Sequence, residues 1–253
     1  MMLAIIGALR EELAGIRKRM DVSEVSLLEN YPVCKGNYRG KNILLVQTGM
    51  GRERAEAATR LLLDSYPVSL LISLGFSGAL SSELKVGDIV ICSRLYGAHG
   101  DTSVKLPGTY YSDNAPVFLI SQALKGAAIG FRHGASVTVA RPVQLPEAKL
   151  ALGKAFDAEV VDMESYWIAE IASGKHIPFI AIRAISDKAH DCLPPFDRIL
   201  TSQGKLILRK TAAHFIARPD HMAVLPVLYW KAWRAGKKLD TVIHHLVTNY
   251  DAA

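Results

Sequence analysis

The chain has few cysteines and lacks any long hydrophobic run. Its three cysteines, Cys34, Cys92 and Cys192, lie far apart and form no CxxC pair, which excludes a disulfide framework and favours reduced thiols. No run approaches the roughly 20 consecutive apolar residues that span a bilayer. The first residues, MMLAIIGALREEL, have no basic segment ahead of their apolar stretch, so they do not resemble a signal peptide. We therefore expect a cytoplasmic protein.

Several common catalytic and cofactor motifs are absent as well. The chain has no HExxH and no cluster of His and Cys, so we expect neither a metal site nor a cofactor. It also has no GxSxG, and its glycine turns Gly49–Gly51 and Gly75–Gly78 are neither GxGxxG nor Walker A motifs. Such turns permit close approach of a ligand, but ordinary turns explain them equally well. Cys192 follows Asp187 closely, yet no base partner for a nucleophilic thiol is evident.

The composition predicts a folded core, with 50% hydrophobic and 21% charged residues. Apolar runs typical of buried strands alternate with helical stretches. This alternation predicts an α/β fold of three layers, in which helices flank a central mixed, mostly parallel sheet. The expected strands cover residues 3–6, 33–38, 42–47, 69–74, 88–93 and 134–140. The expected helices cover residues 9–20, 52–66, 117–129, 146–156 and 198–217.

Two further stretches stand out in this pattern. Residues 160–187 combine the end of a buried strand, a helix, a turn and a second buried strand. Residues 96–116 are rich in Gly, Ser, Asp and Pro and predict a long loop, of the kind that often closes over a site.

The net charge of +6 is concentrated near the C-terminus. Residues 205–253 contain eight Lys or Arg against three Asp, a net charge of +5, which leaves +1 for the first 204 residues. We expect a catalytic domain over residues 1–217 and a basic amphipathic helical extension over residues 218–253. A basic helix with tryptophan can lie on a membrane surface, here the inner membrane, whereas most amphipathic helices pack on their own body or on a second subunit. Both interpretations stay open.

Three acids lie at or just beyond the ends of expected strands: Glu12, Glu164 and Asp187. Ligands of open α/β sheets bind beyond the carboxyl ends of the strands, so these acids could share one crevice. Carboxylates in a crevice repel one another, and one of them can keep its proton and act as a general acid. Cleavage of a glycosidic bond needs such an acid and a base for the incoming nucleophile. A first-turn helix acid and a turn cap explain the same residues equally well.

Four segments together resemble the nucleoside phosphorylase and nucleosidase superfamily, nearest to the methylthioadenosine/S-adenosylhomocysteine nucleosidases. They are IIGALREE (5–12), GMG (49–51), GFSGAL with LKVGDIV (75–80 and 84–90), and residues 160–187. The most specific pattern is VDMES at 161–165, followed about twenty residues later by RAISD at 183–187. The resemblance covers residues 1 to about 200. It implies the three-layer fold, cleavage of a purine nucleoside and a homo-oligomer, with a dimer favoured.

The resemblance also implies a role for each site residue. Glu12 would activate the attacking water, and Asp187 would protonate the purine. Met163 and Glu164 would bind the ribose. The nucleophile or phosphate pocket would comprise Gly7, Gly51, Phe76, Ser77 and Gly78, and the base pocket Val143 and Ser186.

Some positions depart from the superfamily pattern. Phe76 stands where members usually have a small serine, and Pro142 stands where they stack an aromatic residue. Bacterial-type purine phosphorylases hold phosphate with two arginines, and this chain has Glu11 and Ser73 at the matching positions. The sequence therefore leaves water and phosphate as equal candidates for the nucleophile, with phosphate as a co-substrate in the second case.

The C-terminal segment resembles a narrower group. Asp162 before Met163 and the segment RPDHMAVLPVL at 218–228 look like the hopanoid-associated nucleoside phosphorylases, which are thought to remove adenine from adenosylhopane. The alternatives are a methylthioadenosine/S-adenosylhomocysteine nucleosidase, a futalosine-type hydrolase, or a non-catalytic nucleoside-binding or membrane-adaptor module. Nucleic-acid binding is not expected, because the basic residues surround an apolar helix face and form no groove-reading motif.

Overall fold

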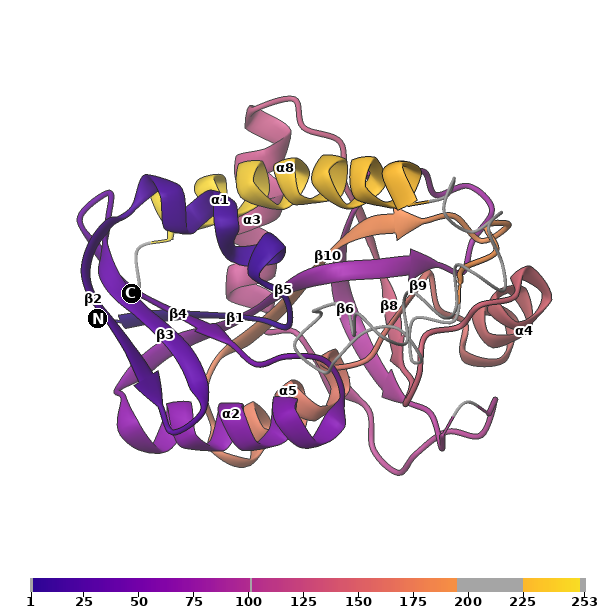
Figure 1. Cartoon of the computed structure of the whole chain (residues 1–253), viewed down its shortest axis with the longest axis horizontal. Coiled ribbons are helices and arrows are strands. Elements are labelled where there is room, and N and C mark those ends of the chain that lie inside the picture. Colours follow the sequence, from indigo (N-terminus) through magenta and orange to yellow (C-terminus); the bar gives the residue numbers. More distant parts are fainter. Residues whose placement is uncertain (1, 101, 195–224, 251–253) are drawn as a thin grey trace.

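The computed structural model describes residues 2–100, 102–194 and 225–250, which form helical layers around a ten-stranded sheet (Figure 1). The strands are β1 (Met2–Gly7), β2 (Asp21–Leu28), β3 (Tyr31–Tyr38), β4 (Lys41–Gln47), β5 (Val68–Ala79), β6 (Ile89–Gly97), β7 (Tyr110–Tyr111), β8 (Arg132–Thr138), β9 (Val160–Asp162) and β10 (Phe179–Asp187). The helices are α1 (Arg10–Arg19), α2 (Arg52–Ser65), α3 (Asn114–Gly126), α4 (Pro146–Phe156), α5 (Ser165–Gly174) and α8 (Leu225–Asn249).

The sheet has a closed part and an open part. Its strand order is β10-β6-β8-β9-β5-β1-β4-β3-β2, and β7 pairs with β6. Because β10 also pairs with β5, the strands β5, β10, β6, β8 and β9 close into a small barrel, from which β1, β4, β3 and β2 extend. The pairing is mixed: β1 runs parallel to β4 and β5, and β10 runs parallel to β5 but antiparallel to β6.

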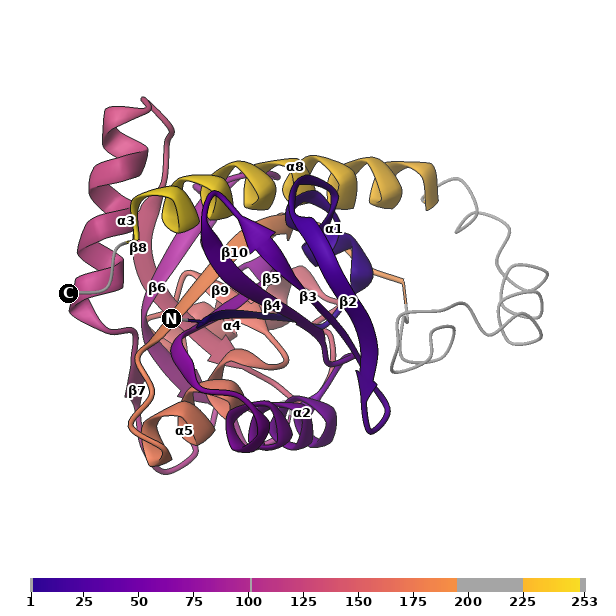
Figure 2. The ribbon, with the colours of Figure 1, turned by 90° about the vertical axis from the view of Figure 1, so that its left-hand side faces the viewer.

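Successive side chains of a strand point to opposite faces, and β1 shows how this builds the layers. Leu3 and Ile5 join a core covered by α1, α3 and α8, whereas Ala4 and Ile6 join a core covered by α2 and α5. The two groups of helices lie on opposite sides of the sheet in Figures 1 and 2. The predicted α/β class, a mixed sheet between helical layers with a C-terminal helix, is confirmed.

The C-terminal helix α8 has two different halves. In its second half Leu239, Val242, Ile243 and Leu246 are fully buried and pack in the core with α1, α3 and β10. In its first half the side chain of Tyr229 is 74% exposed, and two tryptophans there are 48% exposed. The second half therefore packs on its own body. The division at residue 217 and the helix expected over 198–217 lie outside the described residues, so both stay predictions.

Three local features differ from the expected elements. The strand β2 was not expected, because it is a mostly exposed edge strand with little apolar alternation. The expected loop over 96–116 contains the short strand β7, and α3 begins at Asn114, inside the expected loop. Among the described residues, no helix is both long enough and apolar enough to span a bilayer.

Candidate active site

A cavity of about 180 Å³ lies where β1, β5, β9 and β10 end. The predicted site residues converge there although they come from distant segments, and all of them except Gly7 and Gly51 line the cavity. These lining residues are Glu12, Phe76, Ser77, Gly78, Val143, Met163, Glu164, Ser186 and Asp187. The others are Ala8, Leu9, Met50, Val139, Pro142, Val161, Asp162 and Leu193.

Two backbone amides hold the side chain of Glu12, which caps α1 and also lines the cavity. The N–H of Leu9, the residue before α1, donates to Glu12 Oε2 at 2.8 Å, so the glutamate caps the helix. The N–H of Phe76 donates to the other oxygen at 2.8 Å. A side chain at Gly75 or Gly7 would come within 3.0 or 3.2 Å of these oxygens, so both glycines leave room for the carboxyl group. Burial raises the pKa of Glu12 in spite of its hydrogen bonds, which suits a proton acceptor.

Glu164 lies at the start of α5 and is held by the backbone of Gly51. The N–H of Gly51 donates to Glu164 Oε1 at 2.8 Å. Gly51 has φ +93°, a conformation that favours glycine. Burial, followed by the nearby charge of Asp162, raises the pKa of Glu164 to about 8. Glu164 is therefore mostly protonated at neutral pH.

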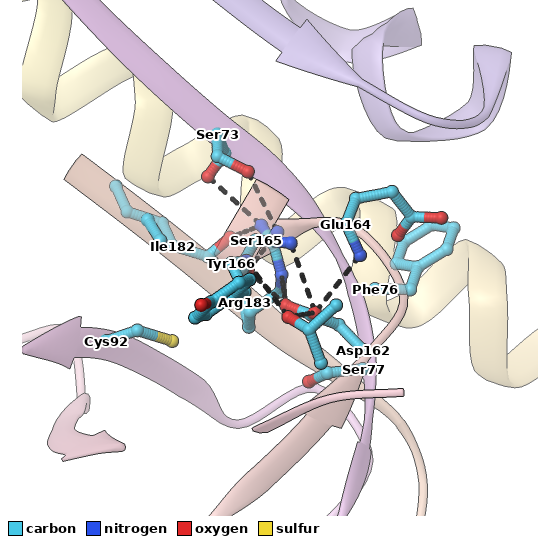
Figure 3. Close-up of polar contacts among 12 residues, drawn as sticks. Ser73, Phe76, Ser77, Cys92, Asp162, Glu164, Ser165, Tyr166, Ile182 and Arg183 are labelled. Carbon is cyan, nitrogen blue, oxygen red and sulfur yellow. Dashed lines mark hydrogen bonds and ion pairs between the residues drawn. The ribbon is translucent and has the colours of Figure 1, made fainter. Parts of the chain in front are cut away.

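Behind Glu164 lies a buried ion pair between Asp162 and Arg183 (Figure 3). Asp162 accepts hydrogen bonds from Arg183, from the hydroxyls of Thr138 and Ser165, and from the amides of Glu164 and Ser165. The N–H groups of Arg183 donate to Asp162 Oδ2 (2.8 Å), Ser73 O (3.1 Å), Ile182 O (3.0 Å), Ser73 Oγ (2.8 Å) and Ser165 Oγ (2.5 Å). All five N–H groups of the guanidinium thus have acceptors.

The environment of this pair keeps both groups charged. Burial alone would raise the pKa of Asp162, but the Arg183 guanidinium and the hydrogen bonds of Ser165 and Thr138 outweigh it and lower that pKa. The hydroxyl and the carbonyl oxygen of Ser73 both accept hydrogen bonds from Arg183. Arg183 had no role in the sequence prediction. A charge inside the apolar strand FIAIRAISD was the available signal, since a buried charge needs a partner.

Asp187 forms a second buried ion pair, with Lys149 of α4. Lys149 Nζ lies 2.5 Å from Asp187 Oδ2, and its side chain is 0% exposed. The hydroxyl of Ser186 lies 2.8 Å from the other carboxyl oxygen. A side chain at Gly78 would come within 2.9 Å of Asp187 Oδ2, so glycine leaves space for the contact with Lys149. The sequence prediction missed Lys149, because it is one lysine within an ordinary helical pattern.

The cavity wall beside Asp187 is largely apolar. Val139, Pro142, Val143 and Leu193 contribute to it. Ser77 provides a polar atom that is not used within the described part of the protein: its Oγ is buried and has no hydrogen-bond partner there. A buried hydroxyl without a partner is costly unless a ligand or water completes its hydrogen bonding.

The ionisable side chains of the cavity wall are all acidic. Four carboxyl groups line it, and no Lys or Arg does so among residues 2–100, 102–194 and 225–250. Arg52 donates to Glu56, and Arg54 donates to the carbonyl of Thr48, so each of these arginines is engaged elsewhere. The same residues contain no group of three His, Cys, Asp or Glu that could hold a metal ion.

Comparison with known sequences assigns the family. The sequence model described as Phosphorylase superfamily matches residues 2–207. The chain belongs to the phosphorylase superfamily. It is 30% identical over 240 residues to the 5'-methylthioadenosine/S-adenosylhomocysteine nucleosidase of Bacillus licheniformis. The aligned region covers 83% of this chain and 97% of the relative. The corresponding nucleosidase of Listeria welshimeri is 31% identical over 206 residues, covering 75% and 88% of the two chains.

Solved structures of superfamily enzymes share the fold. The nucleosidase of Neisseria meningitidis in complex with methylthio-immucillin-A has a TM-score of 0.77 at 21% identity and covers 98% of this chain and 99% of that one. The futalosine hydrolase of Helicobacter pylori has a TM-score of 0.75 at 20% identity, and the match covers 96% of this chain and 97% of the hydrolase. This superfamily member is thus a nucleoside phosphorylase or nucleosidase, an enzyme that cleaves an N-glycosidic bond.

Two of the predicted site residues, Gly7 and Gly51, do not line the cavity but contact residues that do. Gly7 packs behind Glu12, and Gly51 holds Glu164 through its amide. Glu12 caps a helix, as its structural interpretation expects, and it also lines the cavity, while its catalytic role stays a prediction. The exposed thiol of Cys192 is not part of the cavity wall.

Proposed function

We propose that this superfamily enzyme releases the base from an adenine nucleoside by hydrolysis. The observation that supports the proposal is the convergence of Glu12, Glu164 and Asp187 on one cavity, each held by a different partner. Hydrolysis of an N-glycosidic bond needs one group for the base, one for the sugar and one for the water. The relatives at about 30% identity are named for two adenosine derivatives, which favours adenine as the base.

Asp187 acts on the base. Asp187 takes up a proton from water when the nucleoside binds. As the bond between C1′ of the sugar and N9 of the purine breaks, its electron pair moves into the ring, and Asp187 donates that proton to a ring nitrogen. Ser186, which contacts Asp187, and Val143 line the same cavity, which supports their proposed contact with the purine. The protonated base leaves as neutral adenine, and Asp187 is left as a carboxylate.

Glu164 and Glu12 act on the sugar and the water. Glu164 binds the ribose hydroxyls, and Met163 packs against the ring. The sugar carbon becomes positive as the base leaves, and the acidic wall stabilises that charge. Glu12 takes a proton from the attacking water, whose oxygen forms the new bond to C1′. Ser77 Oγ, buried and without a partner among the described residues, offers this water a hydrogen bond.

Water is favoured over phosphate as the nucleophile because the described wall has no cation. The described lining offers a phosphate dianion no Lys or Arg for a charge-assisted hydrogen bond. Ser73, at the position of a phosphate-binding arginine, serves Arg183. Phe76 fills its own position with an apolar ring that packs against the core.

The test is release of adenine from 5'-methylthioadenosine and adenosylhopane, with inosine as the comparison for another base, each with and without phosphate. We expect adenine release that needs no phosphate and gives a free sugar. Formation of a sugar 1-phosphate would overturn hydrolysis while keeping the bond that is cleaved. If no purine nucleoside lost its base but adenosine still bound, the chain would be a nucleoside-binding module.

The substrate proposed at the finer level carries a large apolar 5′ group, as adenosylhopane does. Leu9, Met50, Phe76 and Leu193 give the cavity an apolar part that suits such a group. The relatives support a second candidate, a methylthioadenosine/S-adenosylhomocysteine nucleosidase, and the likeness to futalosine hydrolase supports the fold of a third. A higher kcat/KM for adenosylhopane than for methylthioadenosine would support the first candidate, and the reverse order the second.

A lipid-linked substrate also calls for contact with a membrane, which we propose for the first half of α8. Tyr229, Trp230 and Trp233 are exposed there, with Arg234 and Lys237 beside the two tryptophans at 5.4 and 4.3 Å from the ring centres. Aromatic residues with cations suit an anionic lipid surface. We expect sedimentation with phosphatidylglycerol vesicles to be lost when both tryptophans become serine.

Phe118 is the matched control for this experiment, because it is 66% exposed on another helix. Phe118→Ser should leave vesicle binding unchanged. If the tryptophan variant still sediments with the vesicles, the membrane contact is wrong. The homo-oligomer stays an expectation of the resemblance, and light scattering of the purified chain would test whether it is a dimer.

A further inference from the structure

A buried lysine contacts the proposed proton donor. Lys149 lies on α4, outside the segments that carry the superfamily resemblance, and its side chain is 0% exposed. Its Nζ lies 2.5 Å from Asp187 Oδ2, 3.0 Å from the carbonyl oxygen of Lys188 and 3.1 Å from that of Asp191. A fully buried lysine is rare in folded proteins unless it has a partner.

The partners of Lys149 define its charge. All three are oxygen atoms that accept hydrogen bonds, and an ammonium group has three N–H donors. A neutral amine would turn a lone pair toward one of these oxygens. Lys149 is therefore a buried cation whose hydrogen bonds are all made, with one of them to the carboxyl group of Asp187.

We propose that Lys149 is a positioning residue that makes Asp187 an effective proton donor. This inference rests on the proposed function of Asp187. When the proton moves from Asp187 to the ring nitrogen and the electron pair of the glycosidic bond moves into the purine, Asp187 becomes negative. Lys149 stabilises that carboxylate, and it holds Oδ2 while Oδ1 stays beside Ser186 of the cavity wall. The cation thus acts on the reacting group without touching the substrate.

Other ionisable groups surround Asp187 and bear on the test. Glu12, Asp162 and Glu164 line the same cavity and are all acidic. On the far side, the carboxylate of Asp191 accepts a hydrogen bond from Lys231 of α8 at 2.7 Å. Lys188 is exposed, and the described contact that it makes with Lys149 is through its carbonyl. Within the described residues, Lys149 is the cation in direct contact with Asp187.

The experiment replaces the charge and follows kcat for adenine release from methylthioadenosine across pH. Lys149→Met removes the charge at similar length, and Lys149→Gln also keeps an N–H donor for the backbone carbonyls. We expect either variant to lower kcat by about 10- to 100-fold with little change in KM. We also expect the alkaline limb of the profile to move, because the reacting carboxyl group has lost the cation beside it.

A merely structural lysine would give a different result. Circular dichroism identifies a variant that does not fold, and the glutamine variant serves if the methionine variant fails. A folded variant with normal kcat, or with lower kcat and an unmoved alkaline limb, would overturn the inference. Lys154→Met, at an exposed position of the same helix, and Lys231→Met, which releases Asp191, are the controls and should leave the limb in place.

A double-mutant cycle separates this inference from the proposed function. If Lys149 acts through Asp187, adding Lys149→Met to Asp187→Asn should lower kcat little further. Losses that multiply would overturn the inference alone, since Lys149 would then act elsewhere. An Asp187→Asn enzyme with normal kcat would overturn the proton-donor role, and the inference with it.

Discussion

Two buried cation and carboxylate pairs border the cavity, and they differ in how completely each carboxylate is surrounded. Asp162 accepts hydrogen bonds from five donors, and its side chain is 0% exposed. Asp187 has Lys149 on one oxygen and the hydroxyl of Ser186 at the other, and 8% of its side chain is exposed. A saturated carboxylate has no capacity for chemistry, whereas Asp187 keeps an oxygen near the cavity. The first pair is structural, and the second leaves Asp187 at the cavity wall, where our proposed function needs a proton donor.

The largest expected effect follows from breaking the saturated pair. Arg183→Met would leave Asp162 buried without its cation and should lower the free energy of unfolding by about 3–5 kcal/mol. Urea titration followed by circular dichroism measures this loss. If Arg183→Met kept the stability of the wild type, Asp162 would not depend on its partner, and the distinction between the two pairs would be lost.

Changing the second pair should affect activity more than stability. Asp187→Asn keeps the size of the side chain but cannot supply the proton, so kcat for adenine release should fall about 100-fold or more. Its midpoint in urea should move less than that of Arg183→Met. Steady-state assays of the folded variant provide the measurement, and an undiminished rate would exclude Asp187 as the proton donor.

Glu164, which lies beside the pair of Asp162 and Arg183, makes the stability of the fold depend on pH. Its pKa is about 8 in the folded enzyme, and the ordinary value is 4.5. The folded state then binds more protons than the unfolded state between these values, so stability falls as pH rises from about 4.5 to 8. The slope from this residue is at most about 1.4 kcal/mol per pH unit.

Glu164→Gln removes this titration. The variant should therefore gain stability relative to the wild type as the pH rises through that window, which urea titrations at pH 5, 6.5 and 8 would follow. A difference that stays constant with pH would show that Glu164 titrates alike in both states. Glu12, whose pKa is also raised, is present in both proteins, and its charge contributes to the raised pKa of Glu164.

The smallest expected effects come from the two serines. Ser165→Ala removes a hydroxyl that contacts both Asp162 and Arg183, and should cost about 1–3 kcal/mol because buried polar groups lose partners. Ser186→Ala affects a half-buried hydroxyl beside Asp187 and should cost less stability. Thermal unfolding of the matched pair gives the ranking. The reverse order would mean that the pair at Asp187 is the structural one.

Much of this arrangement could be predicted from the sequence, because its signals are local. Apolar runs and glycine turns gave the main strands, and acids just past the strand ends predicted that Glu12, Glu164 and Asp187 would meet. The edge strand β2 was missed since its exposed residues carry almost no apolar alternation. Residues that are close in sequence determine whether a segment is a helix or a strand and where each strand ends. Because the acids follow strand ends, the same local signals predict that they share a cavity.

The contacts between distant elements could not be predicted in the same way. Lys149 reaches Asp187 across 38 positions of the chain, and nothing near Lys149 marks it as different from other helix lysines. The two halves of α8 have similar spacing of apolar residues, yet one half is core and the other is exposed. Which face finds a partner depends on the packing of α1, α3 and β10 against it, and helical spacing does not contain that information.

The two hydrogen bonds of Glu12 have a consequence for how this enzyme loses activity. The same carboxyl group fixes the first turn of α1 and is the base that we propose for the attacking water, so fraying of that turn would also displace the proposed base. Helix ends open locally at far lower free energy than the whole domain. Activity would then report on a local opening at Leu9 and be lost on warming before the sheet unfolds. Helix α8 packs along α1, and its Gly236 lies beside Glu11 of the first turn, so a segment more than 220 positions away restrains that opening.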